Sequence, residues 1–208
     1  MGTKMHRFSA VASLFALSLL PATAHADFLP TCTRAAFALV IDRSGSMTGQ
    51  PIESAKAAAA ATVDKLSAND CVGVITFDSS PTTVVAMHPL TDPATVKAAI
   101  ARIQPGGGTE ILTALDAAHK ALLGAPAARK KHVVLLTDGQ SPTAGLQALV
   151  QTMSGELMTL STIGFGDSTD EQTLKMLAST GSGRFYRVTD PTTLARTFTR
   201  EVDTVLAP

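Results

Sequence analysis

The chain has 208 residues, 45% of them apolar, and its 17 basic side chains balance 17 acidic ones. This length and composition allow one α/β domain with a sizeable core. The neutral charge gives no electrostatic footprint for nucleic acid or for an anionic membrane surface.

The first 26 residues have the pattern of a cleaved secretory signal peptide. Lys4 and Arg7 lie in a short basic region, residues 8–20 are apolar, and a small-x-small cleavage pattern ends at Ala26. The apolar part is shorter than the ~20 residues that a membrane-spanning helix needs. An uncleaved anchor or a buried helix is the alternative. We expect an exported protein, periplasmic or secreted, in which residues 27–208 form a single domain with no membrane span and a net charge of about −2.

Two cysteines, Cys32 and Cys71, lie in the exported part of the chain. An even number of cysteines in an exported protein permits a disulfide, and each one stands close to the start of an expected strand. If those strands are neighbours, a bridge can form between them. The alternative is two separate buried thiols. Two cysteines without a histidine cluster do not make a zinc site.

Strands and helices alternate along nearly all of the exported chain. This alternation predicts a doubly wound, Rossmann-like three-layer α/β sandwich with right-handed crossovers. The central sheet should be mostly parallel, in the order 3-2-1-4-5-6, with its β-branched third strand as an antiparallel edge strand. We expect strands at 36–41, 71–77, 82–87, 132–137, 158–166 and 184–188, and helices at 52–66, 92–103, 111–123, 141–153, 170–179 and 191–206.

The end of the first expected strand carries three oxygen-bearing side chains. A continuous apolar run, typical of a strand buried on both faces, ends at Asp42, and Ser44 and Ser46 follow at alternate positions around Gly45. In a tight turn these three side chains can converge on one point. Oxygen ligands at the carboxyl edge of a sheet suit a hard divalent cation.

Two more oxygen donors are expected at the same place. Asp138 ends the strand at 132–137, and in the 3-2-1-4-5-6 order this strand and the first one flank the topological switch point. Thr109 follows a glycine-rich loop that can fold over the same crevice. Asp42, Ser44, Ser46, Thr109 and Asp138 are therefore the candidate metal ligands.

These motifs resemble the von Willebrand factor type A domain. The resemblance rests on Asp42-x-Ser44-x-Ser46, on a threonine in a glycine-rich loop, and on the aspartate of Leu-Leu-Thr-Asp-Gly. In that family these positions form the metal-ion-dependent adhesion site. The resemblance implies that Ser44 and Ser46 bind the cation directly. It implies that Thr109 binds directly when a ligand is engaged and otherwise through water, and that Asp42 and Asp138 act mainly through water or by orienting the hydroxyls.

The chemistry of these donors favours Mg²⁺. Neutral hydroxyl ligands leave the ion electrophilic and its coordination incomplete, so that an aspartate or glutamate of a partner protein can complete the octahedron. Mg²⁺ keeps several waters and suits such a site better than Ca²⁺, which prefers more carboxylates, and Mn²⁺ could substitute.

A structural interpretation of the same residues treats them as helix caps and turn formers. Aspartate and serine after a strand commonly cap the next helix, and Thr109 could cap the helix that follows it. Glu110 is expected in the first turn of that helix, where the helix dipole favours it, and not as a ligand. Asp78, at the end of another strand, could border the crevice, but a solvated loop is the expected position. Arg43 either tunes the charge of the ligand-binding face or is solvated.

The expected function is that of a non-enzymatic, exported binding module that captures an acidic group of a partner protein through the cation. A metal-dependent hydrolase using the same crevice is the alternative, but the sequence shows no general base near the ion beyond Asp42 and Asp138. His88, His119 and His132 share no spacing and are expected on the surface or in helices. Phosphate-binding and Gly-x-Ser-x-Gly motifs are absent, and the complete motif argues against a metal-free scaffold.

Overall fold

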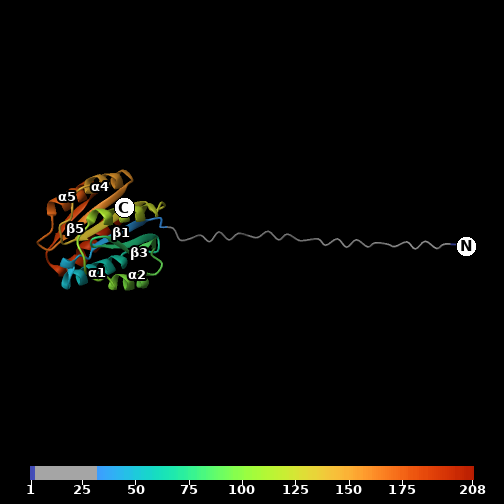
Figure 1. The fold of residues 1–208 in the computed structure, drawn as a ribbon, viewed down its shortest axis with the longest axis horizontal. Helices are drawn as coiled ribbons and strands as arrows, with labels where there is room; N and C mark the ends of the chain where they lie inside the picture. Colours follow the sequence, from blue (N-terminus) through green and yellow to red (C-terminus); the bar gives the residue numbers. More distant parts are fainter. Residues whose placement is uncertain (3–31) are drawn as a thin grey trace.

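The computed structural model describes residues 1–2 and 32–208, so the predicted signal peptide and its cleavage site lie outside the described residues, apart from the first two. A six-stranded sheet lies between two layers of helices (Figure 1). The strands are β1 (Ala35–Asp42), β2 (Asp70–Phe77), β3 (Pro81–Pro89), β4 (Lys130–Thr137), β5 (Met158–Phe165) and β6 (Ser182–Val188). The helices are α1 (Gln50–Val63), α2 (Pro93–Ala101), α3 (Ile111–Leu123), α4 (Leu146–Gly155), α5 (Glu171–Thr180) and α6 (Leu194–Leu206), with short 3₁₀ helices η1 (Gly45–Met47) and η2 (Pro191–Thr193).

The strand order is β3-β2-β1-β4-β5-β6, which confirms the predicted doubly wound sheet. Every neighbouring pair is parallel except β2 and β3, so β3 is the antiparallel edge strand that the sequence predicts. β1 pairs with β2 on one side and β4 on the other, and the order of the strands reverses between β1 and β4. The carboxyl ends of β1 and β4 therefore flank the switch point.

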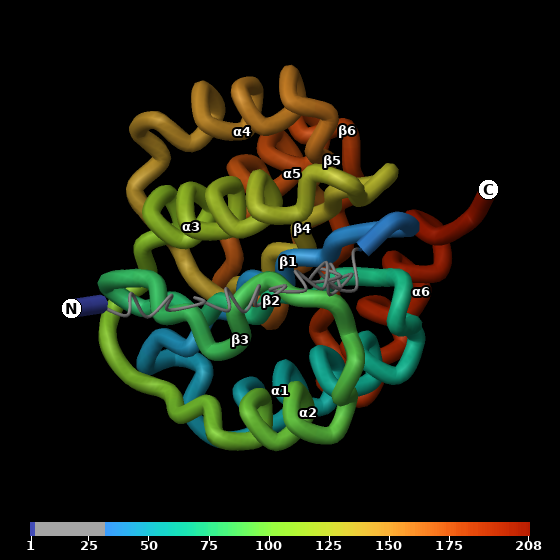
Figure 2. The backbone as a smooth tube through the Cα atoms, turned by 90° about the vertical axis from the view of Figure 1, so that its right-hand side faces the viewer, coloured from blue at the N-terminus to red at the C-terminus, as the bar shows by residue number. Residues whose placement is uncertain are grey.

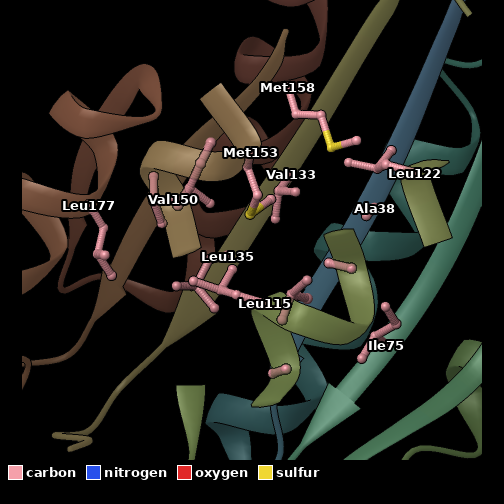
Figure 3. Close-up of a cluster of buried hydrophobic side chains, with 14 of the residues drawn as sticks. Ala38, Ile75, Leu115, Leu122, Val133, Leu135, Val150, Met153, Met158 and Leu177 are labelled. Atoms are coloured by element: carbon pink, nitrogen blue, oxygen red, sulfur yellow. The ribbon is translucent and has the colours of Figure 1, made fainter. Parts of the chain in front are cut away.

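β1 lies at the centre because its side chains can pack on both faces of the sheet, and all eight of its residues are buried. Ala38 and Val40 face a core formed with α3, α4 and α5, whereas Leu39 and Ile41 face a core formed with α1, α2 and α6. The two helical layers lie on opposite sides of the sheet (Figure 2). The close-up of the first core shows leucine, valine and methionine side chains of the sheet and of α3–α5 packed together (Figure 3). These two apolar layers hold the ends of β1 and β4 in fixed positions.

The helix expected at 141–153 begins later than predicted. Ser141 Oγ accepts a hydrogen bond from the N–H of Ile111 at 3.0 Å, so this serine serves the start of α3 and not its own helix. Gly145, with φ of +82°, is the N-cap of α4, and the helix starts at Leu146. A left-handed backbone at this glycine ends the loop and sets the start of the helix.

A disulfide joins Cys32 and Cys71 at the amino edge of the sheet, with their Cα atoms 5.2 Å apart. Cys32 precedes β1, and Cys71 pairs with Ala36 in the register of β1 and β2. Both sulfur-bearing side chains are buried. None of the helices in the described part of the chain is long and apolar enough to cross a membrane.

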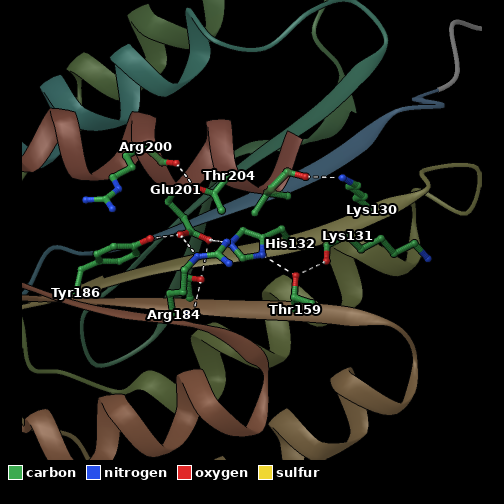
Figure 4. A network of polar contacts seen from close by, with 11 residues as sticks. Lys130, Lys131, His132, Thr159, Arg184, Tyr186, Arg200, Glu201 and Thr204 are labelled. Carbon is green, nitrogen blue, oxygen red and sulfur yellow. Dashed lines mark hydrogen bonds and ion pairs between the residues drawn. The ribbon is translucent and has the colours of Figure 1, made fainter. Parts of the chain in front are cut away.

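Glu201 of α6 is fully buried and connects this helix to strands β4, β5 and β6 (Figure 4). Arg184 donates to its two carboxylate oxygens at 2.7 and 2.8 Å, and the hydroxyls of Tyr186 and Ser161 donate at 2.6 and 2.8 Å. His132 Nε2 lies 3.1 Å from Glu201 Oε1, in a direction that makes no hydrogen bond. Burial alone would raise the pKa of Glu201, but these contacts outweigh it and hold the pKa well below its ordinary value.

The prediction that His132 lies on the surface or in a helix is wrong. It is a buried residue of β4, and its Nδ1 lies 2.7 Å from Thr159 Oγ1. Burial lowers the pKa of His132 against the opposing effect of the neighbouring Glu201 carboxylate. His132 is a buried residue of the sheet, and the spacing between histidines in the sequence does not reveal this burial.

Candidate functional site

Asp42 is the last residue of β1, and its carboxylate is buried at the switch point. Oδ1 accepts a hydrogen bond from the N–H of Ser44 at 2.7 Å, which turns the chain tightly after the strand. Oδ2 accepts one from the hydroxyl of Thr137 at 2.5 Å. The carboxylate is thus oriented from its own loop and from the neighbouring strand β4.

Thr137 is a site residue that the sequence interpretation missed. It is buried at the end of β4, beside β1, and its oxygen also accepts the N–H of Gly139 at 3.2 Å. It therefore links Asp42 to the loop that carries Asp138. Its position directly before Asp138, at the end of the strand paired with β1, is the signal that could have identified it.

Ser44 and Ser46 converge because the chain turns after Asp42 into the 3₁₀ helix η1, which begins at Gly45. Their Oγ atoms are 3.0 Å apart, and the hydroxyl of Ser46 donates to Asp138 Oδ1 at 2.8 Å. The buried side chain of Met47 anchors this turn in the core. Hydrogen bonds thus connect four of the predicted ligands across loops that are about ninety residues apart in the sequence.

The glycine-rich loop before α3 is held against the same turn. The N–H of Gly106 donates to the carbonyl of Arg43 at 2.7 Å, and the N–H of Gly45 donates to the carbonyl of Gly107 at 3.0 Å. Gly107 has φ of +79°, and a Cβ there would lie 2.7 Å from Cβ of Asp78, so the close approach requires glycine. The hydroxyl of Thr109 reaches the Asp138 loop, since a Cβ added at Gly139 would lie 3.4 Å from Thr109 Oγ1.

Asp78 does not lie in a solvated loop as expected. Its carboxylate pairs with Arg43 at 2.5 Å, and its side chain is only 13% exposed. The carbonyl of Asp78 accepts the N–H of Glu110 at 2.8 Å, and the hydroxyl of Ser79 accepts the N–H of Gly108 at 3.0 Å. The end of β2 therefore holds the glycine-rich loop in place. Arg43, expected either to tune the charge of the binding face or to be solvated, forms the ion pair that closes this contact.

The helix-cap interpretation does not describe these hydroxyls. Glu110, expected in the first turn, is the N-cap of α3 and accepts the N–H of Leu112 at 3.2 Å, so Thr109 does not cap that helix. Ser44 precedes η1 without a side-chain capping bond, and α1 begins after Gly49, which has no side chain to offer. Neither the side chain of Ser44 nor that of Thr109 therefore caps a helix.

The two carboxylates of this cluster lack a compensating positive charge, since neither Asp42 nor Asp138 forms an ion pair with any described residue. Burial raises the pKa of Asp42 against the opposing hydrogen bonds, and the charge of Asp138 raises it further. Burial also raises the pKa of Asp138. Two crowded carboxylates and three hydroxyls make an all-oxygen donor set that fits a hard divalent cation. Among residues 1–2 and 32–208, no three or more His, Cys, Asp or Glu side chains gather into a group that could hold a metal ion, so the candidate site depends on its hydroxyls as well as its two carboxylates.

Comparison with known proteins identifies a family for this arrangement. The profile of the von Willebrand factor type A domain matches residues 37–200. The uncharacterized protein sll0103 of Synechocystis sp. is 31% identical over 163 residues, which are 77% of this chain and 39% of that protein. The inter-alpha-trypsin inhibitor heavy chain H4 of Bos taurus is 32% identical over 184 residues, covering 78% of this chain and 20% of that one. The chain thus spans well under half the length of these relatives.

Solved structures share the fold. A von Willebrand factor type A protein from Catenulispora acidiphila has a TM-score of 0.76 and 26% identity, covering 84% of this chain and 43% of that chain. Proximal thread matrix protein 1 from the mussel byssus, solved with a zinc-occupied MIDAS motif, has a TM-score of 0.73 and 23% identity, covering 86% of this chain and 47% of that one. That zinc ion belongs to the byssus protein.

Proposed function

This chain belongs to the von Willebrand factor type A domain family, and on that premise we propose that it is an exported binding module that captures an acidic group of a partner protein through Mg²⁺. The observation that carries the proposal is the hydrogen-bonded cluster at the carboxyl edge, which gathers two uncompensated carboxylates and two hydroxyls beside Thr109. Such modules in this family are typically metal-dependent adhesion or interaction domains. We propose export, Mg²⁺ as the cation and a carboxylate as the partner's ligand for this member of the family.

In this proposal Ser44, Ser46 and Thr109 present hydroxyl oxygens to the cation. Asp138 orients the hydroxyl of Ser46, which donates to it, and Asp42 fixes the turn that carries Ser44 by accepting the N–H of that residue. Both carboxylates supply the negative charge that favours a cation. With few charged ligands the cation keeps much of its positive charge. A carboxylate from outside is then the natural group to complete its coordination.

The site supports binding better than hydrolysis. A hydrolase would need a general base within reach of a water beside the cation. The carboxylates of Asp42 and Asp138 accept hydrogen bonds from Ser44, Ser46 and Thr137. His132 lies near the opposite edge of the sheet, where it contacts Glu201. No observation at the carboxyl edge favours the hydrolase alternative, and we propose a non-enzymatic role.

A pull-down from the extracytoplasmic fraction of the native cell tests the proposal. The purified protein should recover one partner in Mg²⁺ and lose it in EDTA, and Asp138→Ala should lose it in both. Asp167→Ala is the matched control, because Asp167 is an exposed carboxylate at the same edge that pairs only with Arg187. Equal recovery by the Asp138→Ala variant, or recovery that EDTA does not change, contradicts a metal-mediated contact. Turnover of phosphoesters or esters that depends on Mg²⁺ would instead support the hydrolase.

A further inference from the structure

A hollow of about 310 Å³ lies at the amino edge of the sheet, opposite the candidate metal site. It is formed by the starts of β4, β5 and β6 and by the end of α6, which Figure 4 shows converging around Glu201. Its cationic side chains are Arg129, Lys130, Lys131 and Arg184, and none of the described residues that line it is acidic. The hollow is therefore positively charged in a protein whose overall charge is close to zero.

Much of that charge is not compensated within the described residues. Arg184 is neutralised by Glu201 below it. Lys130 donates to the carbonyl of Val205 at 2.8 Å and to that of Ala207, contacts that position its ammonium group without cancelling its charge. Arg129 and Lys131 make no ion pair with any residue that the structure describes. Three positive charges around a concave surface concentrate the field on whatever enters it.

The same hollow holds an unusual pair of backbone conformations. Leu157 and Ser182, with φ of 61° and 53°, are the two residues other than glycine in the described part of the chain that have a positive φ, and both line the hollow. Leu157 is also 86% exposed. Each residue directly follows the C-cap of a helix, Glu156 of α4 and Gly181 of α5, where a left-handed residue commonly ends the helix. The end of α4 thus sets the backbone of Leu157, and its exposed side chain takes no part in core packing.

We propose that this surface, the basic hollow (Arg129, Lys130, Lys131, Leu157 and Ser182), is a second binding site that takes an acidic peptide segment of a partner protein. Carboxylates of the segment pair with Arg129 and Lys131, and an apolar side chain next to them packs on Leu157. The site needs no metal and lies on the far edge from the proposed metal site. It can therefore be tested independently of the proposed function.

The shape and composition of the basic hollow favour a peptide over other anions. A free phosphate would use the charges but leave Leu157 in water. A membrane surface prefers a convex basic face with several apolar side chains, whereas this site is concave and presents one leucine. Nucleic acid would require a larger basic surface than a near-neutral protein provides.

Fluorescence anisotropy in EDTA tests the proposal, with a labelled hexapeptide of alternating glutamate and leucine as the probe. We expect saturable binding that weakens with salt and falls at least tenfold in the Arg129→Glu, Lys131→Glu double variant. Leu157→Asn should weaken binding several-fold while its melting temperature stays equal or rises, because asparagine tolerates a positive φ. Asp138→Ala should bind the probe as well as the wild type does.

Control probes separate the proposed occupant from the others. A hexapeptide of alternating glutamine and leucine, and one of alternating glutamate and serine, should bind at least several-fold more weakly. Equal binding of either peptide, or unchanged binding by the charge-reversed variant, overturns the proposal. Tighter binding of a single-stranded oligonucleotide or of anionic phosphatidylserine vesicles, with no effect of Leu157→Asn, would also overturn it and assign a different occupant.

Discussion

Asp42 and Glu201 are both fully buried carboxylates, but they lie at opposite edges of the sheet and have opposite surroundings. Glu201 accepts two hydrogen bonds from Arg184, and its pKa is held well below the ordinary value. Asp42 accepts hydrogen bonds from neutral groups only, and its pKa is raised. A buried charge is costly unless it is paired. The difference makes Glu201 a structural residue and supports our proposal that Asp42 belongs to a cation site.

The two edges of the sheet differ in the same way. The amino edge carries the disulfide and the Glu201 network, which hold β1, β2 and α6 in place. The carboxyl edge carries glycine loops and hydroxyls whose contacts are mostly neutral hydrogen bonds. Changes at the amino edge should therefore reduce stability, and changes at the carboxyl edge should reduce metal binding.

The largest effect is expected from removing the disulfide. Cys32→Ala together with Cys71→Ala opens a loop whose ends are 39 residues apart, and the loss of this constraint should lower the free energy of unfolding by about 4 kcal/mol. Urea unfolding measures it, and the reduced wild type should match the double variant. Mg²⁺ affinity of the folded variant should be unchanged. A loss below about 1 kcal/mol would show that the disulfide contributes little.

Glu201→Gln should have the next largest effect. Removing the charge from the buried partner of Arg184 should lower the free energy of unfolding by about 3 kcal/mol, because breaking a buried pair leaves the other groups uncompensated. Glu156→Gln is the control, since Glu156 pairs with His119 at an exposed position. Equal stability of the two variants in urea unfolding would contradict a structural role for Glu201.

The pH dependence of stability should follow the same contrast. The lowered pKa of Glu201 means that its contribution is complete above the ordinary value of about 4.5 and is lost as pH falls below it. Wild-type stability should therefore fall between about pH 5 and pH 3 more steeply than that of Glu201→Gln. Thermal unfolding in EDTA across this range measures the difference, and parallel curves would assign the acid sensitivity to other carboxylates.

Gly107→Ala should produce an intermediate effect at the carboxyl edge. The new Cβ would lie 2.7 Å from Asp78 Cβ, and φ of +79° strains any side chain, so stability should fall by about 2 kcal/mol. The loop carrying Thr109 should shift, and Mg²⁺ affinity should fall with it. Gly106→Ala is the matched control, because a Cβ there meets no atom within 4 Å. Calorimetry of both variants with Mg²⁺ should show weakened binding in the first and not in the second.

The smallest effect on stability is expected for Asp42→Asn. In EDTA the free energy of unfolding should change by less than about 1 kcal/mol or rise, because the variant removes an uncompensated buried charge and keeps a polar group of the same shape. Stabilisation by Mg²⁺, which the wild type should show in a thermal shift, should disappear. A large destabilisation in EDTA would make Asp42 a structural residue like Glu201.

The sequence alone determined the layers and the strand order, since apolar runs alternate with helical patterns and parallel crossovers have one hand. It also determined that Asp42, Ser44, Ser46, Thr109 and Asp138 gather at one edge, because strand ends at the switch point must meet there. It did not determine how the strand ends hold the glycine loop. The pairing of Arg43 with Asp78 joins the ends of β1 and β2 across 35 positions, which no local pattern reports.

Tertiary structure alone decided which polar groups are compensated. The partners of Glu201 come from β4, β5 and β6, and Ser141 serves the start of α3 instead of its own helix. Burial and hydrogen bonding of this kind depend on distances between segments far apart in the chain, and residue types and spacing do not contain them. The sequence predicts where oxygen donors gather. The fold decides that Glu201 pairs with the guanidinium of Arg184, whereas Asp42 has no basic side chain of the described residues beside it.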